Sequence, residues 1–128
     1  MAIACFFALS GTGSASRVHE LYAWAAPYHS PVVGVSKSSL HVDERSIARH
    51  VAPGAYRIHV AAQSSMALHL VGPGVDRQSR FTPEAASPVY DTWRVRLVHG
   101  RYRYSGEGLF AKQLRAAGVR VSGSFSVP

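Results

Sequence analysis

The sequence predicts an all-β sandwich in a single domain. Segments 54–62, 65–75 and 91–100 alternate apolar and polar residues with a period of two, and turns rich in Gly, Pro and Ser separate them. Helical periodicity is limited to two short stretches, 17–26 and 109–118, which argues against a sheet whose strands alternate with long helices. The 128 residues are enough to build one hydrophobic core.

Each predicted strand presents one apolar face. A further strand is expected at 118–127, with Gly123 as a bend, and weaker strands are expected at 31–36 and 38–44. Segment 79–92 contains two prolines and is predicted to be a long loop. The residues that the alternation places toward the core are Tyr56, Ile58, Val60, Met66, Leu68, Leu70, Trp93, Val95, Leu97, Val119, Val121, Phe125 and Val127.

Tyr102 stands in the sequence context of a tyrosine corner. It follows the turn at Gly100 and begins a predicted strand, as the corner tyrosine does in Greek-key sandwiches. We expect its hydroxyl to bond to backbone groups across the corner, which is a structural role and not a catalytic one.

The first 16 residues resemble the remnant of a secretory signal peptide. They carry no charge and include an apolar stretch at 2–9, but the basic start of a signal peptide is missing, which a start codon placed too far downstream would explain. A packed N-terminal strand is the alternative. Cys5, the single cysteine, lies in this segment, so a mature chain would have no disulfide and no thiolate ligand. We therefore expect an exported protein, extracellular, periplasmic or in the cell envelope.

The chain is strongly basic. It has 14 Lys and Arg residues against 7 Asp and Glu residues, a formal net charge of +7 and a pI near 10.2, so its surface should attract polyanions, acidic proteins or anionic lipid headgroups. The arginines form no run, so no specific nucleic-acid site is expected. No apolar stretch reaches the roughly 18 residues that a membrane-spanning helix needs.

Five arginines are candidates for binding anions, since the alternation turns them outward. If their strands are neighbours they form a basic stripe that could dock an acidic protein or a cell-envelope polyanion; otherwise they form a solvated surface that opposes edge-to-edge pairing. These residues are Arg57, Arg94, Arg96, Arg101 and Arg103.

Four fragments together resemble the plastocyanin-like, cupredoxin-fold domains of secreted bacterial proteins. They read APGAYRIHV, SSMALHLVGPGVDR, DTWRVRLVHGRYRYSGEGL and SGSFSV, and HLVGPGVDR is the most distinctive piece. The resemblance runs from about residue 38 to residue 127. It implies a cupredoxin-like Greek-key β-sandwich domain at 38–128, preceded by an N-terminal segment at 17–37 and by the signal remnant at 1–16.

In that family, two His, one Cys and a weak axial Met hold a type 1 copper ion. The resemblance places the first His on Met66, the Cys on Gly106 and the second His on Leu109, so the three strong ligands are missing. We expect no cofactor and a monomeric, non-catalytic binding or structural module that has lost its copper site. The insertion 109–118 is longer than the ligand loop of the family, and we expect the segment 106–118 to be mobile or briefly helical.

Two other functions stay open. The alternative is a copper-binding electron-transfer or copper-handling protein that uses histidines outside the family pattern, with His59 and His69 as weak candidates if they lie on neighbouring strands. A hydrolase would need two carboxylates flanking a cleft, and no motif in the sequence supports such a pair, so we do not expect an enzyme.

Overall fold

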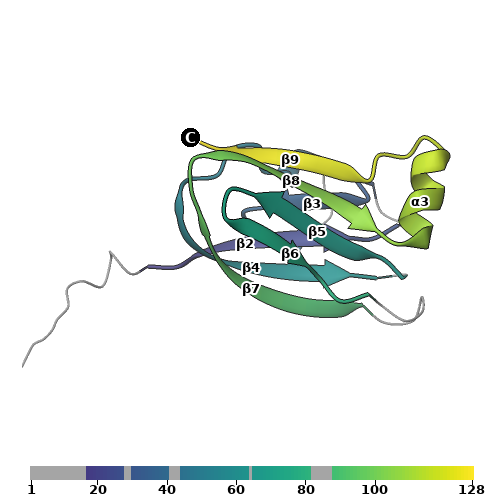
Figure 1. Ribbon diagram of the computed structural model, residues 1–128, viewed down its shortest axis with the longest axis horizontal. Coiled ribbons are helices and arrows are strands. Elements are labelled where there is room, and N and C mark those ends of the chain that lie inside the picture. The colour runs from purple at the N-terminus through teal and green to yellow at the C-terminus, as the bar shows by residue number, and fades with distance from the viewer. Residues whose placement is uncertain (1–16, 28–29, 41–43, 64, 82–87) are drawn as a thin grey trace, which may run out of the picture.

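Two four-stranded sheets pack face to face in the computed structural model, which describes residues 17–27, 30–40, 44–63, 65–81 and 88–128 (Figure 1). The first sheet consists of β2 (His19–Ala25), β3 (Val33–Ser36), β4 (Gly54–Ala62) and β7 (Val89–Leu97). The second consists of β5 (Ala67–Gly72), β6 (Val75–Gln78), β8 (Gly100–Glu107) and β9 (Ser122–Val127). A short 3-10 helix, η1 (Glu44–Ser46), and one α-helix, α3 (Leu109–Ala116), complete the described chain. The all-β sandwich prediction is confirmed.

The chain passes repeatedly between the two sheets. The strand orders are β3-β2-β4-β7 and β6-β5-β8-β9, so strands that are distant in sequence become neighbours. All pairs are antiparallel except β2 and β4, which run parallel from the pair His19 and Tyr56 to the pair Ala25 and Ala62. Helix α3 lies at one end of the sandwich, where it joins the end of β8 to the start of β9 (Figure 1).

The predicted core residues face each other between the sheets. All of them are buried except Val95, which is half-buried and packs against the core, and Val119, which is exposed. Val119 differs because β9 begins only at Ser122, so this residue belongs to the connection that follows α3. The period-two pattern therefore located most of the core, as expected for strands with one buried face.

The helical prediction for 17–26 is wrong, because this stretch contains strand β2. Strand β2 lies between β3 and β4, and its Trp24 is buried on the face away from the core, where the indole packs against Gly34 and donates a 3.3 Å hydrogen bond to the carbonyl of Pro31. A strand buried on both faces loses its alternation and cannot be told from a buried helix by periodicity. Since β2 and β3 complete the first sheet, the boundary expected at residue 38 does not separate them from the sandwich.

Other segment predictions have mixed outcomes. Helix α3 confirms the short helix expected in the 106–118 segment, and β3 confirms the weak strand expected at 31–36. Among the described residues of the expected strand 38–44, residues 38–40 are irregular and Glu44 begins η1. The expected loop 79–92 ends earlier, because β7 begins at Val89. The signal remnant at 1–16 lies outside the described residues.

Strand β6 was missed by the sequence analysis. Its Asp76, Arg77 and Gln78 are all exposed and only Val75 is buried, so it carries no alternation that could have indicated a strand. Its position follows from pairing with β5 through the tight turn after Gly72.

Arginine side chains cover the free edge of β7. Arg77 Nη2 donates a 3.4 Å hydrogen bond to the carbonyl of Arg94, and Arg80 Nη2 donates a 3.1 Å hydrogen bond to the carbonyl of Tyr90. Arg80 also forms a 3.0 Å ion pair with Asp91. Two of the backbone acceptors that this edge strand would offer to another chain are thus engaged within the molecule.

One irregular segment connects the edges of the two sheets. Ile47 forms a bridge with Ser36 of β3, and the amide of Ala48 donates to the carbonyl of Val35. Further along, the amide of Ser126 in β9 donates to the carbonyl of Arg49 at 2.9 Å. The segment 44–51 therefore closes the sandwich between β3 and one end of β9.

The hydroxyl of Tyr102 bonds to backbone groups as expected. It accepts a 3.0 Å hydrogen bond from the amide of Val98 and donates a 3.0 Å hydrogen bond to the carbonyl of Pro73, and the side chain is fully buried. It therefore ties the turn between β7 and β8 to the turn between β5 and β6.

Replacing Tyr102 with Phe should destabilise the fold by about 1–3 kcal/mol, because it removes both hydrogen bonds that this buried side chain makes to the backbone. Urea unfolding followed by circular dichroism measures the loss. Tyr90→Phe is the matched control, since this tyrosine side chain is 63% exposed and should lose almost nothing. Equal losses in the two variants would contradict a corner role for Tyr102.

Candidate functional site

The positions that the resemblance aligns with copper ligands do not fit a copper ion. Met66 is fully buried, and a Cβ placed on Gly106 would lie 2.5 Å from Met66 Cε, so the thioether occupies the space beside the glycine. Leu109, at the start of α3, is 72% exposed. A glycine and an exposed leucine supply no ligand atom from their side chains, and the single thioether is a weak ligand alone.

His59 and His69 are not brought together. His59 lies on β4 in the first sheet, hydrogen-bonds to Glu20 Oε1 at 2.5 Å and stacks on Tyr22 with ring centres 5.0 Å apart. His69 lies on β5 in the second sheet and hydrogen-bonds to Asp76 Oδ1 at 2.7 Å. The condition for a shared site, neighbouring strands, is not met, because β4 and β5 belong to different sheets. In the described part of the chain, no group of three or more His, Cys, Asp or Glu residues could hold a metal ion.

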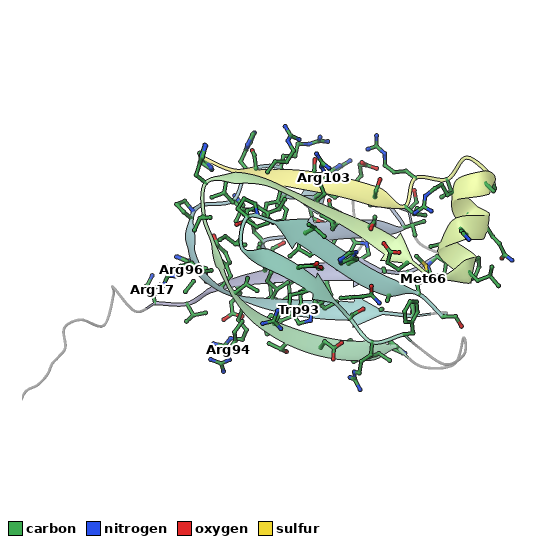
Figure 2. The ribbon with its side chains drawn as sticks, viewed as in Figure 1. Arg17, Met66, Trp93, Arg94, Arg96 and Arg103 are labelled. Atoms are coloured by element: carbon green, nitrogen blue, oxygen red, sulfur yellow. The ribbon has the colours of Figure 1, made fainter. Side chains whose placement is uncertain are left out.

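The five candidate arginines divide between the two sheets. Arg57 on β4 stands directly opposite Arg94 on β7, and Arg96 follows on the same strand, so these three belong to the first sheet. Arg101 and Arg103 lie on β8 in the second sheet. Figure 2 shows Arg94 and Arg96 beside β7, away from Arg103. The arginines therefore form two separate groups and not one stripe.

Arg57 belongs to a small charged cluster on the first sheet. Its Nη2 lies 3.5 Å from Glu20 Oε2, and the other oxygen of Glu20 accepts the hydrogen bond from His59. This hydrogen bond holds the pKa of Glu20 below its ordinary value of 4.5; burial opposes the shift, and the charges of Arg57 and His59 add to it. Arg57 is thus paired with a carboxylate within the chain.

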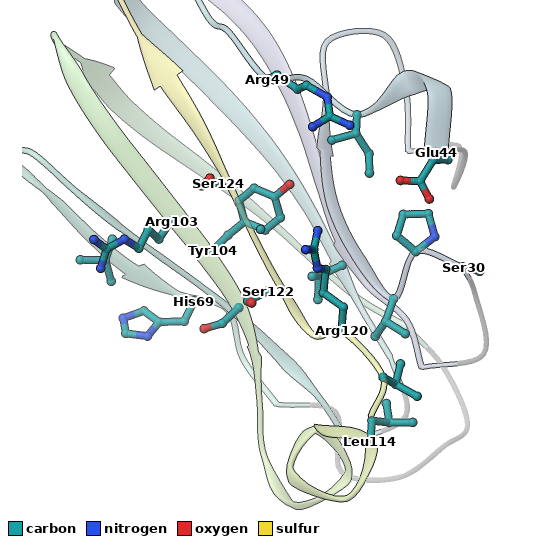
Figure 3. A pocket seen from close by; sticks show the side chains of 18 of the residues that line it. Ser30, Glu44, Arg49, His69, Arg103, Tyr104, Leu114, Arg120, Ser122 and Ser124 are labelled. Carbon is teal, nitrogen blue, oxygen red and sulfur yellow. The ribbon is translucent and has the colours of Figure 1, made fainter. Parts of the chain in front are cut away.

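A groove runs along β9, the last strand of the second sheet (Figure 3). It encloses about 1330 Å³ and is open to solvent. Segment 44–49, the end of α3 and the outer face of the second sheet all contribute side chains to it. Four arginines line it: Arg49, Arg101, Arg103 and Arg120.

Positive charge in the groove is poorly balanced. Glu44 is the only acidic residue among the described residues that line it, and none of Arg49, Arg103 and Arg120 forms an ion pair with a described carboxylate. Figure 3 shows Arg49 and Arg120 on one side of β9 and Arg103 on the other. The groove can therefore attract anions from both sides of this strand.

The phenol of Tyr104 lies at the centre of the groove lining. Its ring is buried beneath Gly123, where a Cβ would stand 2.5 Å from the hydroxyl oxygen. Burial raises the pKa of Tyr104 above its ordinary value of 10.0, whereas an interaction with the backbone of Val35 and the charges of Arg49 and Arg120 oppose this rise. The hydroxyl therefore stays protonated at neutral pH between two cationic side chains.

Arg49, Arg120 and Tyr104 were not candidates at the sequence level. Arg120 had a usable signal, because it alternates with the apolar residues at 119 and 121. Arg49 had none, since it lies in an irregular segment whose contact with β9 depends on the tertiary fold. Tyr104 is buried in step with the alternation of β8, but no local pattern indicates its proximity to two arginines.

The contact between Met66 and Gly106 can be tested by a double-mutant cycle. Gly106→Leu should cost about 1–3 kcal/mol of stability, because the space is already filled. Shortening Met66 to Ala in the same chain should recover part of that cost, giving a favourable coupling of more than about 0.5 kcal/mol. Leu97→Ala, in the core at the end of β7, serves as the control partner. Additive effects of the Met66 and Gly106 substitutions would exclude the contact.

The Glu20 cluster predicts a change in acid stability. A carboxyl whose pKa is lowered by folding stabilises the fold above its ordinary pKa, and this contribution is lost as the pH falls through the folded value. Glu20→Gln should therefore make the stability less dependent on pH below about 4.5. Urea unfolding midpoints measured across the acidic range test this, with Glu44→Gln as the exposed control. Parallel profiles for wild type and Glu20→Gln would contradict the prediction.

Comparisons with known proteins give no family assignment. No family model matches the chain, and no curated protein or solved structure is significantly similar to it. Among the described residues, no helix is both long enough and apolar enough to cross a membrane.

Proposed function

We propose that this chain is a cupredoxin-like Greek-key sandwich without a type 1 copper site and that it acts, after export, as a non-catalytic module that binds an acidic protein. The strand order supports the fold assignment, because β4 lies beside β7 and β5 beside β8 although the chain crosses between the sheets in each interval. Neighbours that are not consecutive are typical of Greek-key connections. The misfit of Met66, Gly106 and Leu109 to copper supports the loss of the metal.

The observation that carries the binding function is a set of arginines around one concave surface, where Arg49, Arg103 and Arg120 have no carboxylate partner among the described residues. Arg49 and Arg120 converge near Tyr104, and Arg103 lies across β9 from them. Charges that line a concave surface focus the field and raise the local concentration of an oppositely charged partner. The arginines on β4 and β7 lack this arrangement, since they lie on an outer sheet face and Arg57 is paired with Glu20.

Binding of an acidic probe should depend on the groove and not on net charge alone. Fluorescein-labelled dodecaglutamate, titrated at low salt and followed by anisotropy, should bind about tenfold more weakly to Arg49→Ala/Arg120→Ala than to wild type. Arg94→Ala/Arg96→Ala removes the same charge from the other sheet and should change the affinity less than about twofold. The affinity of wild type should fall as salt increases.

Equal losses in the two double variants would overturn the groove as the binding site. Dextran sulfate in the same assay separates the two classes of anionic partner. If dextran sulfate depends on Arg49 and Arg120 while dodecaglutamate does not, the partner is a cell-envelope polyanion and the assignment to an acidic protein is wrong.

A further inference from the structure

The backbone of β9 has an open edge inside the basic groove. The amide of Ser126 donates to the carbonyl of Arg49, and its carbonyl accepts from the amide of Val51, both at 2.9 Å. Both backbone groups of Ser126 therefore point away from β8. Backbone groups alternate in direction along a strand, so those of Ser122 and Ser124 point the same way. Since β9 is the last strand of its sheet, these two residues present four backbone groups to the groove.

The groove beside this edge has room for one extended chain. At one end it is bounded by segment 44–51, which bonds to Ser126, and at the other by the end of α3. Apolar side chains from three elements, Val33, Ile47 and Leu114, also line it. A strand placed here would therefore have backbone partners on one side and apolar contacts on the other.

Charge selects the kind of chain that can enter. Arg49 and Arg120 line the groove, and neither is paired with a carboxylate among the described residues. An added strand turns every second side chain toward them, so carboxylates at alternate positions would meet both cations. A second copy of this protein is disfavoured, because two β9 edges in contact would bring four of these arginines together.

We propose that the acidic partner binds as an extended segment that pairs with β9 and adds a fifth strand to the second sheet. This inference rests on the proposed function and specifies its mode. The partner segment carries acidic residues at alternate positions, its backbone bonds to Ser122 and Ser124, and its carboxylates bind Arg49 and Arg120.

A pair of peptides of equal charge tests the strand pairing. The probe is acetyl-Glu-Val-Glu-Val-Glu-Val-Glu-amide, and its control carries N-methyl groups on alternate backbone nitrogens of either register. Calorimetry should show that methylation in one of the two registers weakens binding about tenfold, because it removes the donors that face β9. Equal affinity of the unmodified peptide and both methylated forms would overturn the strand pairing.

A matched pair of protein variants tests the same edge. Ser124→Pro removes the outward amide without changing charge, and proline is tolerated on edge strands whose amide faces solvent. Ser124→Ala is the control, since both variants lose the 3.2 Å hydrogen bond from Arg101 to the serine hydroxyl. We expect binding about tenfold weaker for Ser124→Pro than for Ser124→Ala. Equal binding would contradict the proposal.

Amide exchange in the wild-type protein keeps the test valid even if Ser124→Pro does not fold. Saturation with the Glu-Val peptide should slow exchange of the Ser122 and Ser124 amides, and unchanged exchange would overturn the strand pairing.

The proposed function can fail independently of the strand pairing. If binding is insensitive to Arg49→Ala/Arg120→Ala, the groove is not the binding site. If binding depends on these arginines but not on methylation or on Ser124→Pro, the groove stands and only the strand pairing is wrong.

Discussion

Two sheets can share one core only if every second residue of each strand faces the opposite sheet, and the rest of this structure follows from that constraint. Tyr56, Ile58 and Val60 of β4 meet Leu68 and Leu70 of β5 across the core, so the residues between them must face outward. Five of the outward positions of β4, β7 and β8 are occupied by arginines. The basic surface is thus divided into two groups by the same pairing that builds the core.

This constraint also explains how far the sequence alone could predict the molecule. Alternation identified the inward residues of β4, β7 and β9, because each of these strands has one face toward the core and one face toward solvent. It could not identify β2, whose Trp24 is covered by Gly34 on the outer face. Alternation also gives the face of a residue within its sheet but not the sheet to which the strand belongs, which is why the sequence could not tell whether His59 and His69 lie on neighbouring strands.

The groove depends on contacts that no local pattern contains. Arg49 reaches β9 because segment 44–51 joins the two sheet edges, and Ser126 lies 77 residues further along the chain. The end of the sandwich near α3 is likewise built by packing between residues that are distant in sequence. There Gly106 leaves the space that Met66 fills, and Ala111 of α3 lies 3.7 Å from where a Cβ on this glycine would stand. The helix therefore closes the core over a methionine and a glycine at the aligned copper-ligand positions.

The arginines that cover β7 have a consequence for how molecules of this kind can associate. A filament built by strand addition needs two edge strands with free backbone groups in each molecule. One edge pairs with the preceding molecule and the other with the next one. Because Arg77 and Arg80 already donate to the carbonyls of Arg94 and Tyr90, the β7 edge offers few acceptors to a neighbour. A guest strand bound at β9 could therefore not be continued through these two carbonyls of β7, which opposes growth from one bound partner into a polymer at that edge.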